Sequence, residues 1–329
     1  MNRLVSLSVF LCLMAACAPS PARAAFTRAS NAEPIQLWQD ASIFQLIHAL
    51  IDTARHRVLV EVYEIGRPDL ISQMVNARHR GVDVRVVTDP TVQASRSAAA
   101  ELDREGVPEL FYPVDDAAHQ IDHVKLLIAD GEAVVGGMNW GAHSSRNHDY
   151  VVDTRAPTDL DRLTHIFEQD WSLSRGRPSP LAPRAGDIGQ TAPGHEIRAM
   201  LRRVMGAARM RILAEVYTFT DPDVIAALAA AHLRGVDVRI PLDPSQPYNR
   251  PTFQLLRSSG VSVRWYPVPP GALLHAKAGL FDGELLLGSA NWTYSGLDVN
   301  HELDVETADK RAVGGYETRF ENDWATSPA

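Results

Sequence analysis

Apolar residues recur with a helical period at two places in the chain, and each run precedes a stretch rich in β-branched residues. The two runs consist of Ile43, Leu46, Ile47, Leu50 and Ile51, and of Ile197, Met200, Leu201, Val204 and Met205. Residues three or four apart share one helix face, so both runs predict amphipathic helices. The stretches that follow, residues 57–63 (Arg-Val-Leu-Val-Glu-Val-Tyr) and 211–217 (Arg-Ile-Leu-Ala-Glu-Val-Tyr), each predict a buried strand.

This agreement extends along most of the chain and identifies an internal repeat. The other matching segments are Arg80–Arg85 with Arg234–Arg239, and Phe167–Trp171 with Phe320–Trp324. Gly81 and Gly235 each follow a second predicted helix, where glycine suits the left-handed turn at a helix end. Alternating strands and helices predict an α/β fold, with helices packed on a largely buried sheet in each copy.

We place the first repeat at residues 36–171 and the second at residues 190–325. The segment between them, residues 172–189, is rich in proline and glycine and is expected to be a linker.

Residues 1–24 have a different pattern. A short basic start is followed by an apolar run and then by small residues, which is the layout of a secretory signal. The run is shorter than the roughly 20 apolar residues that a bilayer requires, and Pro19 and Pro21 close it. The sequence therefore predicts export to the periplasm or the exterior.

Two cleavage sites compete. Leu13–Cys17 resembles a bacterial lipobox, which would make an outer-membrane lipoprotein beginning at Cys17, whereas Ala22-Arg23-Ala24 suits ordinary signal peptidase. Both cysteines of the chain lie before residue 18, so the folded part contains no disulfide, thiolate nucleophile or cysteine metal site.

The composition and net charge of the chain limit the classes of function to be considered. The chain has 329 residues, 45% of them hydrophobic, which is typical of a globular protein. Its net charge of -8 disfavours binding to nucleic acid, since such proteins are usually basic.

One polar motif occurs twice, within otherwise apolar segments. The copies are His123, Lys125, Asp130, Gly136, Gly137 and Asn139, and His275, Lys277, Asp282, Gly288, Ser289 and Asn291. Side chains two apart share one face of a strand, so each histidine lies beside its lysine. Asp-Gly favours a tight hairpin, which gives Asp130 and Asp282 a structural role at the turn.

The lysines support a functional interpretation. The chain has three, Lys125, Lys277 and Lys310, among 32 basic residues, and two of them follow these histidines. An ammonium group on a long stem can reach the oxygens of a phosphate. A purely structural polar pair is the alternative, and its recurrence at unchanged spacing argues against it. A metal site is disfavoured because a lysine among the ligands repels a cation.

His-x-Lys-(x)4-Asp followed by Gly-(Ser/Gly)-x-Asn, present twice, resembles the phospholipase D superfamily across both halves of the chain. The resemblance implies a phospholipase D fold: two repeated α/β units, each a mixed sheet flanked by helices, packed about a pseudo-twofold axis with one shared site. It also implies that one histidine attacks phosphorus and the other protonates the leaving alkoxide, with no metal or other cofactor. By chain order we assign His123 as the nucleophile and His275 as the acid. The residues expected to grip the phosphate are Lys125, Lys277, Asn139 and Asn291.

Family members place an acidic residue downstream to hold each histidine, and the repeat-matched residues here are Asp149 and Glu302. A strand-end salt bridge is the alternative for both. The first copy has Gly137 where the second has Ser289, so the resemblance makes Ser289 the better phosphate contact.

The loops before the histidines bear on the substrate. Residues 114–122 contain three acids and no lysine or arginine, and residues 268–274 are apolar. A nucleic-acid groove needs cations, whereas an apolar rim suits acyl chains or a membrane surface. We expect an exported phosphodiesterase that hydrolyses or transfers the phosphatidyl group of glycerophospholipids, as a monomer with an internal pseudo-dimer. The alternatives are a metal-independent endonuclease, a phosphatidyltransferase of cardiolipin synthase type, and a non-catalytic phosphate-binding protein.

Overall fold

The computed structural model of the chain describes residues 35–177, 180 and 187–328. The predicted signal peptide, with both of its cleavage sites, lies outside the described residues. In the described part, no helix has the length and apolar character needed to span a membrane.

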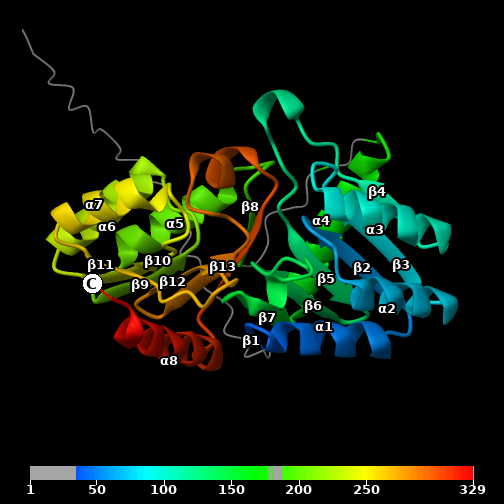
Figure 1. The fold of residues 1–329 in the computed structure, drawn as a ribbon, viewed down its shortest axis with the longest axis horizontal. Helices are drawn as coiled ribbons and strands as arrows, with labels where there is room; N and C mark the ends of the chain where they lie inside the picture. Colours follow the sequence, from blue (N-terminus) through cyan, green and yellow to red (C-terminus); the bar gives the residue numbers. More distant parts are fainter. Residues whose placement is uncertain (1–34, 178–179, 181–186, 329) are drawn as a thin grey trace, which may run out of the picture. The chain divides into compact units, whose positions relative to one another are not determined.

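Each repeat forms a seven-stranded mixed sheet, and the two sheets have equivalent strand orders (Figure 1). In spatial order, the first sheet consists of β4 (Glu109–Phe111), β3 (Asp83–Thr88), β2 (Arg57–Val62), β5 (Lys125–Ala129), β6 (Glu132–Gly136), β7 (Tyr150–Thr154) and β1 (Gln36–Gln39). The second consists of β11 (Ser262–Trp265), β10 (Asp237–Leu242), β9 (Arg211–Val216), β12 (Lys277–Phe281), β13 (Glu284–Gly288), β14 (Leu303–Thr307) and β8 (Ile188–Gln190). The first three strands of each order are parallel to one another, and the remaining pairs are antiparallel.

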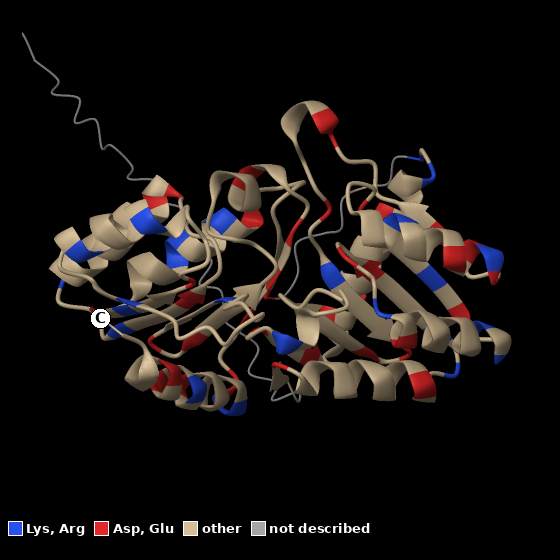
Figure 2. Ribbon diagram, viewed as in Figure 1, with Lys and Arg blue, Asp and Glu red and all other residues tan. Residues whose placement is uncertain are grey.

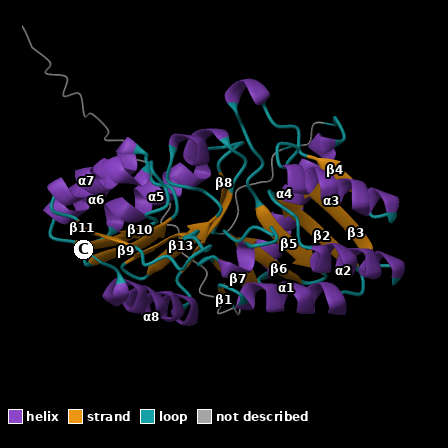
Figure 3. Ribbon diagram, in the orientation of Figure 1, coloured by secondary structure: helices purple, strands orange, loops and turns teal. Residues whose placement is uncertain are grey.

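Helices accompany the strands in both repeats (Figure 3). Those of the first repeat are α1 (Ser42–Thr53), α2 (Pro68–His79), α3 (Gln93–Arg104) and α4 (Pro157–Ser174). Those of the second are α5 (Glu196–Ala207), α6 (Pro222–Leu233), α7 (Asn249–Ser258) and α8 (Lys310–Thr326). The predicted helices and strands around Gly81 and Gly235 are present, and both glycines have a φ of 89°.

The alternation of side chains along the strands separates three hydrophobic cores. In β2, Val58, Val60 and Val62 pack in the core that contains α1, α2 and α3, whereas Leu59 belongs to a central core. The strand β9 is divided in the same way between a core with α5, α6 and α7 and the central core.

The central core joins the two repeats. It contains residues of both sheets together with α4 and α8, including the fully buried Phe167 and Phe320. Burial of one large apolar side chain contributes about 1.5–3 kcal/mol, so this shared core stabilises the repeats as one unit. The predicted fold class, with two packed α/β repeats, is confirmed.

The linker is shorter than the composition indicates. The helix α4 continues to Ser174 because Trp171 and Leu173 pack against the central core. On the other side, β8 begins at Ile188 and pairs with β14, so the second repeat starts before residue 190.

Candidate active site

The two hairpins carry their motifs on rigid elements. Asp130 lies between β5 and β6, and Asp282 lies between β12 and β13, with positive φ values of 50° and 56°. The carboxylate of each accepts three backbone N–H groups, from Arg55, His56 and Arg57 or from Arg209, Met210 and Arg211. These bonds tie the turn to the start of the neighbouring strand, β2 or β9. The structure thus places both aspartates at the turn, away from the chemistry.

His123 and His275 line one pocket of about 670 Å³, and both are only 5% exposed. The pocket lining includes the two motif asparagines, Asn139 and Asn291. Residues of both repeats therefore meet in a single site.

A carboxylate from the opposite repeat contacts each histidine. His123 Nδ1 lies 2.8 Å from Glu302 Oε2, and His275 Nδ1 lies 2.6 Å from Asp149 Oδ2. An Nδ1–H that donates to a carboxylate leaves the lone pair on Nε2, the nitrogen available for attack or proton transfer. The sequence identified both acids, and the structure shows that the pairing is crossed between the repeats.

Polar groups hold the Glu302 carboxylate. Ser289 Oγ donates to Oε2 at 2.6 Å, and Asn300 Nδ2 donates to Oε1 at 3.0 Å. Burial raises the pKa of Glu302 to about 7, against the opposing effects of Lys125 and Ser289. The hydroxyl of Ser289 thus donates to Glu302 and accepts from the N–H of Leu303 at 3.0 Å, and the phosphate contact expected of it stays a prediction.

The difference between Gly137 and Ser289 has a steric cause. A Cβ atom at Gly137 would collide with the carboxylate of Asp149, which occupies that space in the first repeat. Asp149 also accepts a hydrogen bond from the backbone of Tyr150 at 2.8 Å. Gly137 therefore leaves the space that the carboxylate of Asp149 occupies.

Both motif lysines are buried next to the catalytic histidines. Lys125 and Lys277 are 3% and 2% exposed, and each Nζ donates to the carbonyl oxygen of the histidine two residues before it. Burial lowers the pKa of Lys125 to about 7 and that of Lys277 to about 8. When both ammonium groups are protonated, they provide positive charge next to the catalytic histidines and attract an anion.

The same environment favours neutral histidines. Burial and the neighbouring lysines lower the pKa of His123 well below its usual value, and lower that of His275 to about 3. The sequence interpretation required one neutral and one protonated imidazole. In the ligand-free site both are favoured neutral, and a bound phosphodiester anion would raise their pKa values again.

Two tyrosines of the pocket were missed from the sequence. The rings of Tyr63 and Tyr217 lie 4.9 Å and 4.8 Å from the rings of His123 and His275. Each also lies under a lysine ammonium, at 5.3 Å and 5.2 Å. Both tyrosines end the repeated strand segments at residues 57–63 and 211–217, so the repeat itself contained the signal.

The two loops that precede the histidines differ in their exposed groups. Asp115 and Asp116 are exposed in the loop before His123. In the other loop Leu273 lines the pocket, whereas Leu274 is completely buried in the central core. Only part of the predicted apolar rim therefore faces a substrate.

Comparison with known families identifies the arrangement. The sequence model of the family described as cardiolipin synthase, PLD-like domain, matches residues 47–171 and 201–324. The chain belongs to the phospholipase D superfamily. Both matched ranges contain one complete motif hairpin, so the family assignment covers both halves of the site.

Curated relatives within the phospholipase D superfamily include cardiolipin synthases. Cardiolipin synthase 2 of Bacillus anthracis is 28% identical over 321 residues, covering 85% of this chain and 62% of the relative. Cardiolipin synthase A of Pseudomonas entomophila is 28% identical over 333 residues, covering 90% and 69%. This chain thus spans 62% of the length of the Bacillus relative.

Solved structures share the phospholipase D fold. Phosphatidylserine synthase of Haemophilus influenzae Rd KW20 superposes with a TM-score of 0.72 at 12% identity, covering 89% of this chain and 86% of that chain. Polyphosphate kinase of Porphyromonas gingivalis gives 0.63 at 17% identity, covering 87% and 46%. At these identities the likeness shows the fold alone.

Proposed function

We propose that this chain transfers the phosphatidyl group of a glycerophospholipid to an alcohol through a phosphohistidine, with water as a competing acceptor. The observation that carries the proposal is the crossed pairing of His123 with Glu302 and of His275 with Asp149 around one pocket. Two histidines with fixed tautomers above two buried lysines suit displacement at phosphorus. The names of the relatives, cardiolipin synthases, favour transfer over hydrolysis.

The charges at the pocket favour a lipid over a nucleic acid. Lysine and arginine are interspersed with aspartate and glutamate in both repeats (Figure 2). The residues that line the pocket include Glu64, Ala272 and Leu273, and none of those that the structure describes is a lysine or arginine. A nucleic-acid groove would need cations along its lining to neutralise the phosphates.

In the first chemical step, His123 Nε2 attacks phosphorus and the bond between phosphorus and the leaving alcohol oxygen breaks. His275, protonated once the anionic diester is bound, gives its proton to the leaving oxygen. Lys125 and Lys277 stabilise the charge that develops on the phosphoryl oxygens.

In the second step, the acceptor alcohol loses its proton to His275, and its oxygen displaces His123 from phosphorus. Glu302 holds His123 in one tautomer throughout, because its carboxylate accepts the Nδ1–H bond. The exchange of one ester bond for another of similar energy needs no external energy source.

The proposal is tested by the products. The purified chain is incubated with phosphatidylglycerol in mixed micelles and, separately, with single-stranded DNA, both with EDTA, and the products are identified by mass spectrometry. We expect diphosphatidylglycerol and glycerol in EDTA, with phosphatidic acid as a minor product.

Other products would contradict parts of the proposal. Phosphatidic acid alone would replace transfer by hydrolysis. Faster cleavage of DNA, falling steeply with salt, would identify a nuclease. Loss of activity in EDTA and its return with zinc would contradict the proposed mechanism.

The pH dependence follows from two groups. As pH rises through about 7 the free protein loses the Lys125 ammonium that binds the diester, and as pH falls through about 7 it loses the Glu302 carboxylate. We expect kcat/KM for a soluble phosphodiester to peak near neutral pH and to fall on both sides. The alkaline fall should be weaker in kcat, because the bound anion raises the pKa of the lysine. A kcat/KM that is constant from about pH 5 to about pH 9 would contradict these assignments.

A further inference from the structure

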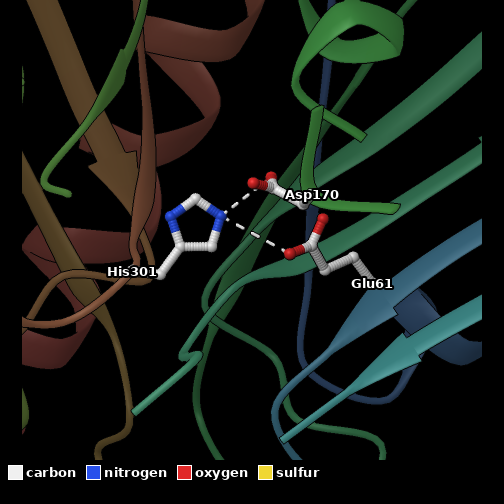
Figure 4. Close-up of side chains that lie close together, drawn as sticks. All are labelled: Glu61, Asp170 and His301. Carbon is white, nitrogen blue, oxygen red and sulfur yellow. Dashed lines mark hydrogen bonds and ion pairs between the residues drawn. The ribbon is translucent and has the colours of Figure 1, made fainter. Parts of the chain in front are cut away.

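Two buried clusters of one histidine and two carboxylates lie outside the pocket, and each joins the two repeats. In the first, His301 Nε2 lies 3.0 Å from Asp170 Oδ2 and 3.4 Å from Glu61 Oε1 (Figure 4). His301 belongs to the second repeat, whereas Glu61 on β2 and Asp170 on α4 belong to the first. All three residues are 0% exposed.

The second cluster has the same composition with the repeats exchanged. His148 of the first repeat lies 3.4 Å from Glu215 Oε2 and 3.3 Å from Asp323 Oδ2, both in the second repeat. Its other nitrogen, Nδ1, lies 2.7 Å from Asp40 Oδ1. Such reciprocal contacts are those of a twofold relation between the repeats.

Both histidines have acceptors on both ring nitrogens. His301 Nδ1 faces the carbonyl oxygen of Ala192 at 2.6 Å, while Nε2 faces the two carboxylates. A ring that donates from both nitrogens is an imidazolium ion. Burial alone lowers the pKa of His148, but Glu215 and Asp40 outweigh it and raise the pKa to about 9. Burial also lowers the pKa of His301, but Tyr112 and Asp170 outweigh it and hold that pKa well above its usual value.

Backbone hydrogen bonds join His301 and His148 to the catalytic histidines. His301 precedes Glu302, and its backbone accepts from the N–H of His123 at 2.8 Å and donates to Ile121 at 2.9 Å. His148 precedes Asp149, and its backbone accepts from the N–H of His275 at 2.8 Å. Anchoring either imidazolium therefore also anchors the adjacent carboxylate and the backbone of the catalytic histidine.

We propose that His301 and His148 are positioning residues: each is a buried cation, held by carboxylates of the opposite repeat, that sets Glu302 or Asp149 against a catalytic histidine. The proposal rests on the phosphohistidine chemistry proposed above. The two histidines would keep the carboxylates of one repeat correctly placed against the catalytic histidines of the other.

The two clusters differ in their other charges. Among the described residues, no lysine or arginine forms an ion pair with Glu61 or Asp170, and the nearby buried Asp122 Oδ2 has no hydrogen-bond partner. In the second cluster Arg319 bonds to Asp40 and Asp323 at 2.6 Å and 2.7 Å. Loss of His301 therefore leaves buried carboxylates without their cation, whereas loss of His148 leaves Arg319 in place.

The test compares three variants, His301→Gln, His148→Gln and the control His165→Gln. His165 lies on α4 like Asp170 but is exposed, and its hydrogen bond and ion pair are both with Asp161 of the same helix. For bis(p-nitrophenyl) phosphate, at a temperature where each variant is folded by circular dichroism, we expect kcat of His301→Gln to fall by about tenfold or more, with KM within about twofold. The kcat of His148→Gln should fall less, and the kcat and KM of His165→Gln should equal those of the wild type.

Nuclear magnetic resonance of the histidine ring nitrogens gives a readout that does not depend on activity. In the wild type at neutral pH, His301 should carry protons on both nitrogens, and His123 should show a low-field Nδ1 proton bonded to Glu302. That His123 signal should shift or broaden in His301→Gln. If His301→Gln does not fold, Asp170→Asn takes its place, with the same expected loss.

An unprotonated Nε2 on His301, whether neutral or bound to a metal ion, would overturn the proposal. An unchanged kcat together with an unchanged His123 signal in the variant would also overturn it. If the wild type turns over no phosphodiester, the proposed function fails, and the His123 signal alone then decides the positioning role.

Discussion

Replacing His123 by asparagine should abolish turnover of every phosphodiester, whereas replacing His275 should block only steps that need proton transfer. Loss of the nucleophile removes the covalent route altogether, and we expect kcat to fall by about a thousandfold or more. Loss of the acid costs about 10²–10⁴-fold when the leaving group is an alkoxide. A p-nitrophenolate leaves without a proton, so His275→Asn should still complete the first step with bis(p-nitrophenyl) phosphate.

The result should be a burst of one p-nitrophenolate per chain, followed by a stall, because the second step lacks its base. Intact mass spectrometry should find the aryl phosphoryl group on His123 in His275→Asn and none in His123→Asn. Both side chains face the pocket, so thermal melts of both variants should remain close to that of the wild type. A burst in His123→Asn, with the adduct on His275, would reverse the assignment of the two roles.

The second repeat alone, residues 187–329, should be inactive, and mixing with residues 1–177 should restore activity. The isolated repeat lacks Asp149, which holds His275, and it lacks His123. Its sheet would also expose the face that packs in the central core. The expected readout is no phosphodiesterase activity above background, measured together with the oligomeric state by light scattering.

Homodimerisation provides the control for this experiment, since two copies of the second repeat would again bring two histidines together. Activity that appears only in a dimer would fit the composite site. Full activity in a demonstrably monomeric fragment would contradict it.

The sequence was sufficient to predict the fold because repeated local patterns determine it. Helical periodicity located α1 and α5, and Asp-Gly located both hairpin turns. The linker was placed from residue 172, but α4 continues to Ser174 because Trp171 and Leu173 pack against the central core. Local composition contains no information on that packing.

Only those features of the site that lie within a short stretch of sequence were predictable. The two-residue spacing of His123 and Lys125 predicts that they share one face of a strand. The partner of His123, however, is the carboxylate of Glu302, which is 179 residues away in the sequence. The sequence pattern does not specify which repeat supplies the carboxylate that contacts a given histidine. The buried clusters had a visible signal, because Glu61 and Glu215 interrupt apolar strands at matching positions. A buried carboxyl group repeated in this way needs a polar partner, and here His301 and His148 are those partners.

The fusion of the two repeats into one polypeptide has an evolutionary consequence. In an assembly of two identical subunits, every substitution appears on both sides of the symmetry axis. Here the first repeat has Asp149 and Gly137 where the second has Glu302 and Ser289, and both repeats make the crossed contact. Two repeats in one polypeptide can be substituted independently, so the side proposed to attack phosphorus and the side proposed to move the proton can carry different residues.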